Sequence, residues 1–407
     1  MNILRFLTAG ESHGKALIGI IEKIPSGLAL SSDDIDSELK RRQLGYGRGG
    51  RMKIEQDRVQ ILSGVRWGKT IGSPISLLIE NRDWVNWQEG MSTESVHEGF
   101  LAPVTKPRPG HADLGGALKY NQKDVRNILE RSSARETAMK VALGAIAKKF
   151  LSVFSVHIGS CVTQIGSICI PETMLKEFRH GISLAHFMKK IDSSPVRCPD
   201  EKAAADMMAL IDRAQRDGDS LGGRFEVVVA GLPAGLGSHI QWDRRLDGML
   251  SQSFMGIQAV KGVEIGDGFT YADKFGSKVM DEIFHGGQNL VNKEKTLEGG
   301  MGFYRLTNHA GGIEGGISNG MPVVVKAVMK PIPTLKMPLQ SVDIITKEPF
   351  RAAYERSDIC AVPAAAVIGE AMAALVITDA FLEKFGGDSL YESKRNYDAY
   401  IDYLKEF

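Results

Sequence analysis

The sequence predicts an α/β protein of one domain, residues 1–407, in which buried helices lie between sheets and two related halves repeat one arrangement. Three observations predict this fold. Runs of Val and Ile bounded by Gly, Pro or Asp alternate with segments of helical periodicity. One helical segment is apolar on nearly every side. Several short motifs recur in the same order about half a chain apart.

The predicted strands are runs rich in Val and Ile, which favour the extended backbone. They are Gly19 to Ile24, Val59 to Val65, Ile75 to Glu80, Val156 to Ile165, Phe225 to Ala230 and Val323 to Met329. A further short apolar run precedes Gly10 and predicts a strand near the N-terminus.

The predicted helices begin with a short amphipathic one after Ser31. Asp33 and Asp34 follow this cap, and Lys40 to Arg42 end the segment, as the helix dipole favours. Longer helices are expected at Ala134 to Leu151, Glu201 to Arg216, Arg244 to Met255 and Val362 to Phe385, the last buried on most sides. The polar segment from Thr270 to Gly300 lacks periodicity, so we expect a long surface excursion or flexible loop there.

Short motifs that repeat within the sequence suggest an internal duplication of the chain. The matched pairs are IPSGL at 24–28 with LPAGL at 232–236, HADLGG at 111–116 with HAGG at 309–312, and RSS at 131–133 with RSD at 356–358. They predict halves of about 1–200 and 220–390, packed about a pseudo-twofold axis. Because Gly and Ala are common and each match is short, chance similarity is the alternative.

Composition excludes several classes of protein. The 50 Lys and Arg residues nearly balance the 49 Asp and Glu residues, so no overall field attracts nucleic acid or a membrane surface. The 4 cysteines form no CxxC pair and have no histidine at zinc-finger spacing, so we expect neither a structural metal nor disulfides. No leader-like start and no apolar run of about 18 residues is present, which predicts a cytoplasmic protein.

A basic, glycine-rich stretch from Lys40 to Arg51 follows the first helix. It contains Arg42, Arg48 and Arg51. Glycines allow close approach of a ligand, and guanidinium groups bind phosphate or carboxylate through paired hydrogen bonds. The alternatives are a solvated basic loop or an RNA-binding segment, although the stretch has few aromatic residues for stacking on bases.

Two histidines are candidates for proton transfer. His13 lies in GESHG directly after the first short strand, and His111 lies with Arg108 in a loop that prolines stiffen. An imidazole titrates near neutral pH and can donate a proton to a phosphate. A structural histidine and an ordinary surface turn are the alternatives.

Three further stretches carry anion-binding or titratable groups. Arg131 to Thr137 (RSSARET) is expected to open a helix, where hydroxyls and free backbone N–H groups converge on an anion; plain capping is the alternative. Lys330 to Thr334 offers a cation and a hydroxyl on a rigid turn after a strand. Asp358, near Arg356, is either half of a structural ion pair or a functional base.

The motifs of ATP, zinc and dinucleotide sites are missing from the sequence. Arginine, serine, glycine and two histidines remain. This set suits a small substrate that carries phosphate and carboxylate groups, together with a phosphorylated cofactor.

Taken together, the blocks GESHG, RPGHAD, RSSARETA, QAVKGVEIGDGF, NHAGGIEGGISNG and KPIPT resemble the chorismate synthase family, in that family's order, from Leu7 to about Gly387. The resemblance implies a carbon–oxygen lyase of the shikimate pathway. It would eliminate phosphate from 5-enolpyruvylshikimate 3-phosphate in a 1,4-anti sense to give chorismate, with reduced FMN as cofactor. It also implies an α+β sandwich, with helices between two antiparallel sheets, and a homotetramer.

The resemblance also implies roles for individual residues. FMN contacts fall on Arg131, Ser132, Ser133, Gln258, Ala259, Gly315, Lys330, Pro331, Ile332, Pro333, Thr334 and Arg356. Arg42 and Arg48 match NADP positions, and the substrate arginines are Arg48, Arg51, Arg108 and Arg135; the sequence does not separate the two sets. His13 would protonate the leaving phosphate, His111 would act at the flavin N1 side, and Asp358 would assist removal of the ring proton. Ser357 and Ile359 depart from the family's R-H-D-P-C.

Two points stay open. A flavin- or NADP-binding oxidoreductase would use the same phosphate ligands, and an RNA-binding module would use the 40–53 basic run. The sequence also leaves open whether the enzyme reduces its own flavin, with NADPH as a possible reductant. No appended reductase domain is visible, so we expect dependence on a separate flavin reductase.

Overall fold

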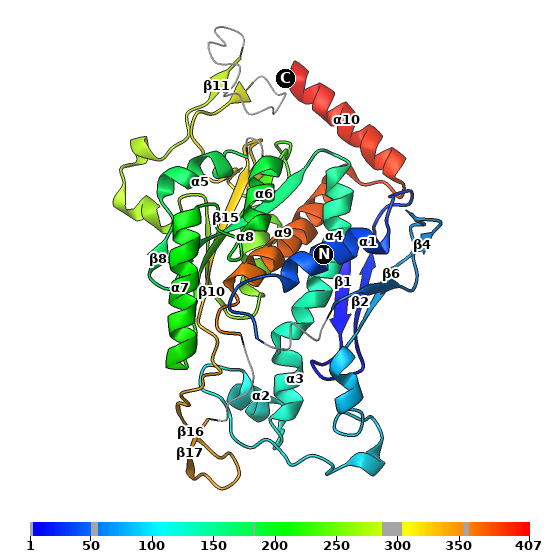
Figure 1. The fold of residues 1–407 in the computed structure, drawn as a ribbon. Helices are drawn as coiled ribbons and strands as arrows, with labels where there is room; N and C mark the ends of the chain where they lie inside the picture. Colours follow the sequence, from blue (N-terminus) through cyan, green and yellow to red (C-terminus); the bar gives the residue numbers. More distant parts are fainter. Residues whose placement is uncertain (1–2, 50–55, 182–183, 287–302, 353–357) are drawn as a thin grey trace.

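The computed structural model describes residues 3–49, 56–181, 184–286, 303–352 and 358–407, and shows helices between two antiparallel sheets (Figure 1). The first sheet has the order β1 (Arg5–Ala9), β2 (Ala16–Glu22), β6 (Ile75–Glu80), β3 (Val59–Ile61). The second has the order β10 (Val260–Ile265), β15 (Val323–Met329), β9 (Gly223–Ala230), β7 (His157–Ile165), β8 (Ile168–Cys169). Every pairing within them is antiparallel.

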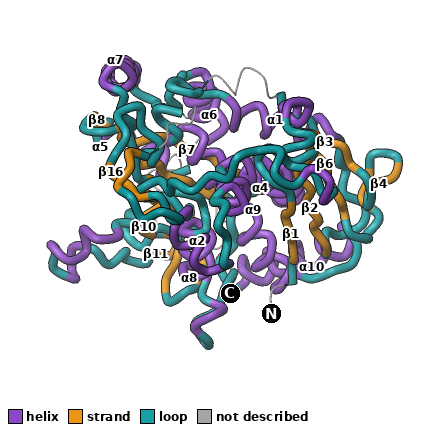
Figure 2. The backbone as a smooth tube through the Cα atoms, turned by 90° about the horizontal axis from the view of Figure 1, so that it is seen from below, coloured by secondary structure: helices purple, strands orange, loops and turns teal. Residues whose placement is uncertain are grey.

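Four helices fill the space between the sheets. They are α1 (Ser32–Gln43), α4 (Thr137–Ser152), α8 (Leu246–Met255) and α9 (Val362–Phe385). Helices α1 and α4 pack on the first sheet, α8 and α9 pack on the second, and α4 lies against α9 in the middle (Figures 1 and 2). The predicted sandwich is therefore confirmed.

The remaining elements surround this core. The helices are α2 (Asp113–Tyr120), α3 (Arg126–Ser132), α5 (Glu172–Arg179), α6 (Leu184–Ser193), α7 (Glu201–Asp217) and α10 (Leu390–Glu406). Short strands pair as β4 (Val65–Arg66) with β5 (Lys69–Thr70), β11 (Phe284–His285) with β12 (Phe303–Tyr304), β13 (Ile313–Glu314) with β14 (Ile317–Ser318), and β16 (Gln340–Val342) with β17 (Pro349–Arg351). Short 3₁₀ helices lie at Arg82–Asn86, Ser95–His97, Ala134–Glu136, Trp242–Arg244, Gly268–Asp273 and Gly276–Lys278.

Helix α1 forms where its local signals predict it. The Ser31 side chain accepts from the Asp34 backbone N–H, and the Asp34 carboxylate accepts from Ser31 in return, which completes a capping box. Ile35 and Leu39, one turn apart, are fully buried against α4 and the first sheet. Burial of this stripe fixes the position of Lys40 to Arg42 at the end of the helix.

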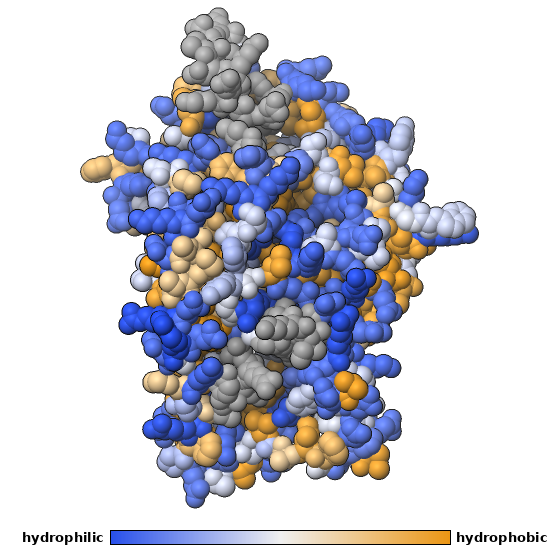
Figure 3. Space-filling model, viewed as in Figure 1, coloured by the Kyte–Doolittle hydropathy of each residue, from blue (hydrophilic) through white to orange (hydrophobic). Residues whose placement is uncertain are grey.

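Helix α9 is the centre of the core, as its composition predicts. Among the described residues it is the one helix apolar and long enough to cross a membrane, and 94% of its most apolar window is buried inside the protein. That burial is typical of a core helix. The outer face drawn in Figure 3 is mostly hydrophilic, with hydrophobic side chains scattered over it.

The two sheets share one connectivity. β1 lies beside β2 as β7 lies beside β9, and α1 follows β2 as α8 follows β9. The next strands also correspond, because β3 is the edge neighbour of β6 as β10 is of β15. IPSGL follows β2 and LPAGL follows β9. The internal duplication stays a prediction, which this shared order favours.

The segment predicted as a surface excursion is only partly described. Its residues 270–286 include the end of one 3₁₀ helix (Gly268–Asp273), a second one (Gly276–Lys278) and β11, and the side chains of Phe275 and Met280 are exposed. Residues 287–300 lie outside the described part.

Candidate active site

The loop between β1 and β2 carries His13 and has a fixed shape. Gly10 has φ +104°, and a Cβ there would lie 2.3 Å from the Ala16 carbonyl oxygen, so only glycine fits. The buried Asn81 amide donates to the carbonyls of Glu11 (3.1 Å) and Gly14 (2.7 Å). These bonds hold the loop on both sides of His13.

His13 is oriented by a buried carboxylate. Glu130 accepts from the His13 backbone N–H at 2.7 Å, and its other oxygen lies 2.8 Å from Nδ1 of the ring. The ring stacks on Trp87 with 4.2 Å between centroids. The imidazole therefore has one defined direction in the site.

The RSSARET stretch departs from its prediction. Arg131 and Ser132 form the last turn of α3, not the start of a helix, and the break falls at Ser133, whose backbone is extended (φ −61°, ψ 142°). The Ser133 hydroxyl then accepts from the Arg135 N–H, which caps the 3₁₀ turn leading into α4. The Ser132 hydroxyl instead donates to the Ile128 carbonyl at 2.9 Å.

Arg131 and Ser133 meet the His13 loop. The Arg131 guanidinium donates to the carbonyls of Gly10 (3.0 Å) and Thr8 (2.9 Å). The hydroxyls of Ser12 and Ser133 lie 3.1 Å apart. Residues more than a hundred positions apart thus form one polar surface.

Two buried arginines lie next to this surface. Arg135 donates to Asn81 (2.8 Å) and to Asp57 (2.5 Å), and Arg42 donates to Thr137 and to the Ala134 carbonyl, both at 3.0 Å. Burial, together with the cations Arg48 and Arg135, lowers the pKa of Arg42 to about 10 although Asp57 opposes this. Arg42 therefore has a structural part in holding the start of α4.

Asp358 pairs with the predicted arginine loop. Its carboxylate lies 3.3 Å from Nε of Arg48 and accepts from the Gly49 N–H at 2.6 Å. Arg42, Arg48, Asp358 and Gln258 line a cavity of about 40 Å³ against Ala364 and Ala365 of α9. Arg51 and Arg356 lie outside the described residues, so the pairing of Asp358 with Arg356 is not described.

His111 has a carboxylate partner of its own. Its Nδ1 lies 2.5 Å from Asp113, which also accepts from the Arg108 backbone N–H (3.0 Å) and side chain (2.9 Å). Burial raises the pKa of Asp113, but hydrogen bonds from His111 and Arg108 outweigh it and hold this pKa well below the usual range. Arg108 also donates to Thr334 at 3.3 Å, and Lys330 donates to the Gly110 carbonyl.

Two contacts connect the residues around His111 with those around His13. The Lys330 N–H donates to the Ala259 carbonyl at 2.9 Å, and the Gln258 amide donates to Glu136 at 3.0 Å. Glu136 accepts from Thr8 at 2.9 Å, beside Arg131. A chain of contacts therefore links the turn Lys330–Thr334, which includes Pro331, Ile332 and Pro333, to the His13 loop.

Gly315 is not part of this group within the chain. It lies in the β13–β14 turn, where Gly316 accepts from the Leu246 N–H at the start of α8. Gln258 follows the other end of α8, and Lys330 lies at the far end of β15. A strand of this length spans roughly 20 Å.

The sequence argument missed several site residues. They are Asp57, Asn81, Trp87, Asp113 as the partner of His111, Glu130 and Glu136. A usable signal existed for Asp113, two positions after His111, and for Glu130, directly before RSS. Chemically, the site offers guanidinium groups and hydroxyls for anions and two histidines for proton transfer.

Comparisons with known proteins agree with this chemistry. The family model described as chorismate synthase matches residues 4–382. The chain is 57% identical to chorismate synthase of Geobacter metallireducens and 54% identical to that of Aquifex aeolicus, over 100% of each chain. It is also similar to a solved structure titled "Crystal Structure of Chorismate Synthase", with TM-score 0.78, 45% identity and 99% of both chains covered.

Proposed function

We propose the roles of the site residues from one premise, that the chain belongs to the chorismate synthase family. It is an enzyme of aromatic amino-acid biosynthesis, a lyase that eliminates phosphate from 5-enolpyruvylshikimate 3-phosphate to give chorismate. The family depends on a flavin. A match across residues 4–382 favours neither the oxidoreductase nor the RNA-binding alternative.

The observation that carries the mechanism is the position of His13, beside Arg131 and Ser133 and fixed by Glu130. His13 donates a proton to the leaving phosphate. Arg48, Arg51, Arg108 and Arg135 bind the substrate's phosphate and carboxylates. Preorganised cations stabilise the charge that grows on the leaving group, and one such donor is typically worth about 3 kcal/mol of barrier.

An unused acceptor in the site suits the ring of a flavin, whose N–H groups donate hydrogen bonds. The buried Gln258 Oε1 has no hydrogen-bond partner among the described residues, so it is available to accept from a ligand. We assign FMN to Gln258 and Ala259, to the turn Lys330–Thr334, and to Arg131, Ser132, Ser133 and Arg356. Reduced FMN, when bound, supplies an electron-rich ring that promotes loss of phosphate.

His111 and Asp358 complete the assignment. With a flavin bound, His111, held by Asp113, would protonate or stabilise its N1 side, and Asp358 would assist removal of the ring proton. Arg42 and Arg48 are the residues proposed for NADPH, should NADPH reduce the flavin directly. A separate flavin reductase is the other source of electrons.

The oligomeric state determines whether Gly315 can contact FMN. We assign a homotetramer in the cytoplasm, each chain forming a single domain with duplicated halves. Gly315 lies at the opposite end of β15 from Lys330. If Gly315 contacts FMN, a neighbouring subunit supplies it.

An anaerobic assay with chemically reduced FMN tests the function. We expect chorismate and phosphate in equal amounts without net consumption of reduced FMN. Replacing His13 or His111 with Ala lowers turnover by about two to four orders of magnitude, the scale of general acid catalysis. The exposed His157 gives a matched His→Ala control. Net oxidation of FMN in each turnover, or near-normal rates in both His→Ala variants, contradicts the proposal.

A further inference from the structure

We infer that Glu130 is a positioning residue, which fixes the tautomer and the direction of the His13 ring. This inference rests on the proposed role of His13 as the acid that protonates the leaving phosphate. Glu130 lies near the end of α3 and is not among the residues that the family resemblance assigned.

Glu130 binds His13 at two points. One carboxylate oxygen accepts from the His13 backbone N–H at 2.7 Å, and the other lies 2.8 Å from Nδ1 of the same residue. The first bond positions the loop. The second reaches the ring, so the backbone and the imidazole of His13 cannot move independently.

Glu130 is buried and has a cation beside it. The side chain is 1% exposed, and the Arg126 guanidinium, one turn earlier on α3, lies 3.7 Å from the oxygen that faces the ring. A buried carboxylate without such partners is strongly unfavourable. An ionised carboxylate only accepts hydrogen bonds, so the proton of neutral His13 resides on Nδ1.

The consequence is that Nε2 is the ring nitrogen that exchanges a proton with the substrate. In the protonated ring, Nε2–H transfers its proton to a phosphate oxygen as the carbon–oxygen bond breaks. The Glu130 oxygen 2.8 Å from Nδ1 stabilises the imidazolium that precedes the transfer.

Trp87 prevents the ring from turning away. It stacks on His13 at 4.2 Å with an angle of 29° between the planes, and its own indole N–H donates to Asp83 at 3.1 Å. The Arg126 guanidinium lies 5.1 Å from the Trp87 ring. Arg126 therefore contacts both groups that hold His13.

His111 has the same arrangement of contacts, on a different loop. Asp113 pairs with its Nδ1 at 2.5 Å and also accepts from a backbone N–H of the loop, that of Arg108, at 3.0 Å. In both cases one carboxylate holds the loop and the ring together. A carboxylate that only stabilised a loop would need no contact with the ring.

The variants Glu130→Gln and Glu130→Asp test the inference. The glutamine oxygen still accepts from the His13 backbone N–H, but its NH₂ group faces Nδ1 and favours the tautomer with the proton on Nε2. We expect kcat to fall by about 10² to 10⁴, as for the equivalent change in a catalytic triad, while KM changes by less than about threefold. Glu130→Asp keeps the carboxylate, and its kcat should be at least about tenfold higher than that of Glu130→Gln.

Solid-state ¹⁵N NMR of protein labelled in its histidine rings gives a readout that does not need flavin or substrate. The chain has 9 histidines, and a His13→Gln variant identifies the His13 signals by difference. We expect the neutral ring to carry its proton on Nδ1 in the parent protein and on Nε2 in Glu130→Gln. Glu38→Gln removes an ion-paired carboxylate remote from the loop and is expected to keep kcat.

The outcomes separate the two proposals. An unchanged tautomer in Glu130→Gln, or an equal loss of kcat in Glu38→Gln, overturns the role of Glu130. Full turnover in His13→Gln overturns the proposed acid itself. An inactive His13→Gln together with a fully active Glu130→Gln overturns only the present inference.

Discussion

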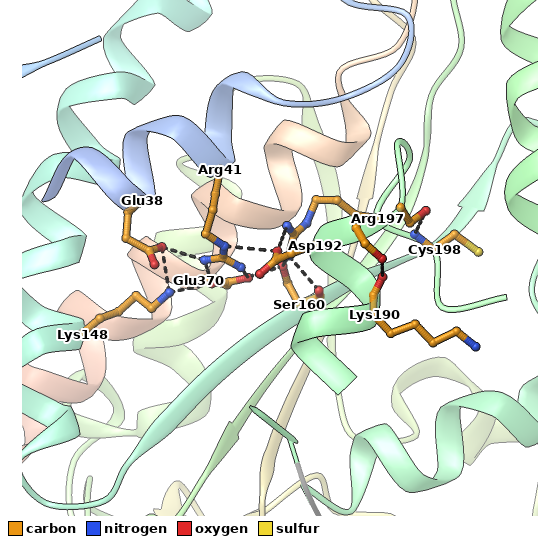
Figure 4. Close-up of polar contacts among 11 residues, drawn as sticks. Glu38, Arg41, Lys148, Ser160, Lys190, Asp192, Arg197, Cys198 and Glu370 are labelled. Carbon is orange, nitrogen blue, oxygen red and sulfur yellow. Dashed lines mark hydrogen bonds and ion pairs between the residues drawn. The ribbon is translucent and has the colours of Figure 1, made fainter. Parts of the chain in front are cut away.

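The Glu370 carboxylate accepts two hydrogen bonds from the Arg41 guanidinium, at 2.7 and 2.8 Å, in the centre of the protein (Figure 4). Glu370 is fully buried on α9, and Arg41 lies in the last turn of α1. Lys148 of α4, Arg197 and Ser160 of β7 also donate to Glu370. One carboxylate thus connects three core helices to the second sheet.

Loss of the Glu370 charge is expected to destabilise the fold. Glu370→Gln leaves Arg41, Lys148 and Arg197 without their shared partner, and breaking a buried ion pair on one side costs about 3–5 kcal/mol. Urea unfolding measures the change. Arg213→Ala breaks an exposed pair with Asp217 and should alter the free energy of unfolding by less than about 1 kcal/mol. An equal effect in the two variants contradicts the importance of the cluster.

The same carboxylate predicts loss of stability in acid. Burial opposes its ionisation, but the charges of Arg41 and Lys148 outweigh burial and hold the pKa of Glu370 far below its ordinary value of 4.5. Its contribution is complete above that ordinary value and is lost as the pH falls towards the folded-state pKa. Melting temperatures measured from neutral pH down to about pH 3 should therefore fall less steeply in Glu370→Gln than in the parent protein.

The contact between α4 and α9 depends on Gly144. A Cβ at Gly144 would lie 2.4 Å from Cβ and 2.6 Å from Cα of Ala371, so the helices must separate in Gly144→Ala. Overpacking of this kind costs about 1–3 kcal/mol. Adding the second change, Ala371→Gly, should restore only part of the lost stability, because the clash with Cα of residue 371 remains. Gly248→Ala, which meets nothing closer than 3.8 Å, is the control for adding a methyl group to a helix.

Asp113→Asn should lower kcat by about a hundredfold or more through His111. Hydrogen bonds from His111 and Arg108 hold the pKa of Asp113 well below its ordinary value against the effect of burial, so Asp113 stays ionised at any assay pH. The ratio of parent to variant kcat should accordingly be constant between about pH 6 and 8. A ratio that changes tenfold across this range would exclude a purely orienting carboxylate.

Asp358 and Arg48 should respond differently to substitution although they form an ion pair. If Asp358 assists proton removal, Asp358→Asn lowers kcat by about 10² to 10⁴. If Arg48 binds a substrate carboxylate, whose charge does not change in the reaction, Arg48→Gln should chiefly raise KM for the substrate. Steady-state kinetics of both variants separate a base from a structural pair.

Local signals in the sequence predict much of the fold. The cap at Ser31 and the apolar stripe through Ile35 define α1, and the Val- and Ile-rich runs become β6, β7, β9 and β15. The strand β10 was not predicted because Gly262 and the charged Lys261 and Glu264 interrupt its apolar residues, and its pairing with β15 has a bulge near Gly262. The break at Ser133 escaped because good helix formers stand on both sides of it.

The site is less predictable than the fold. Motifs and the family resemblance select His13, His111 and most of the arginines. Their convergence depends on long-range contacts, such as that of Gln258 with Glu136, which no local pattern contains. The partners Glu130 and Asn81 act through bonds that exist only once the chain has folded.

The position of α9 near the end of the chain determines when the core can form during synthesis. The helix begins at residue 362 and covers both α4 and the second sheet. Until the ribosome has produced it, the apolar surfaces of α4 and of the second sheet that it covers face solvent, where they are prone to self-association. The core therefore closes only near the end of synthesis, and chains that stop before α9 should depend on chaperones to stay dispersed.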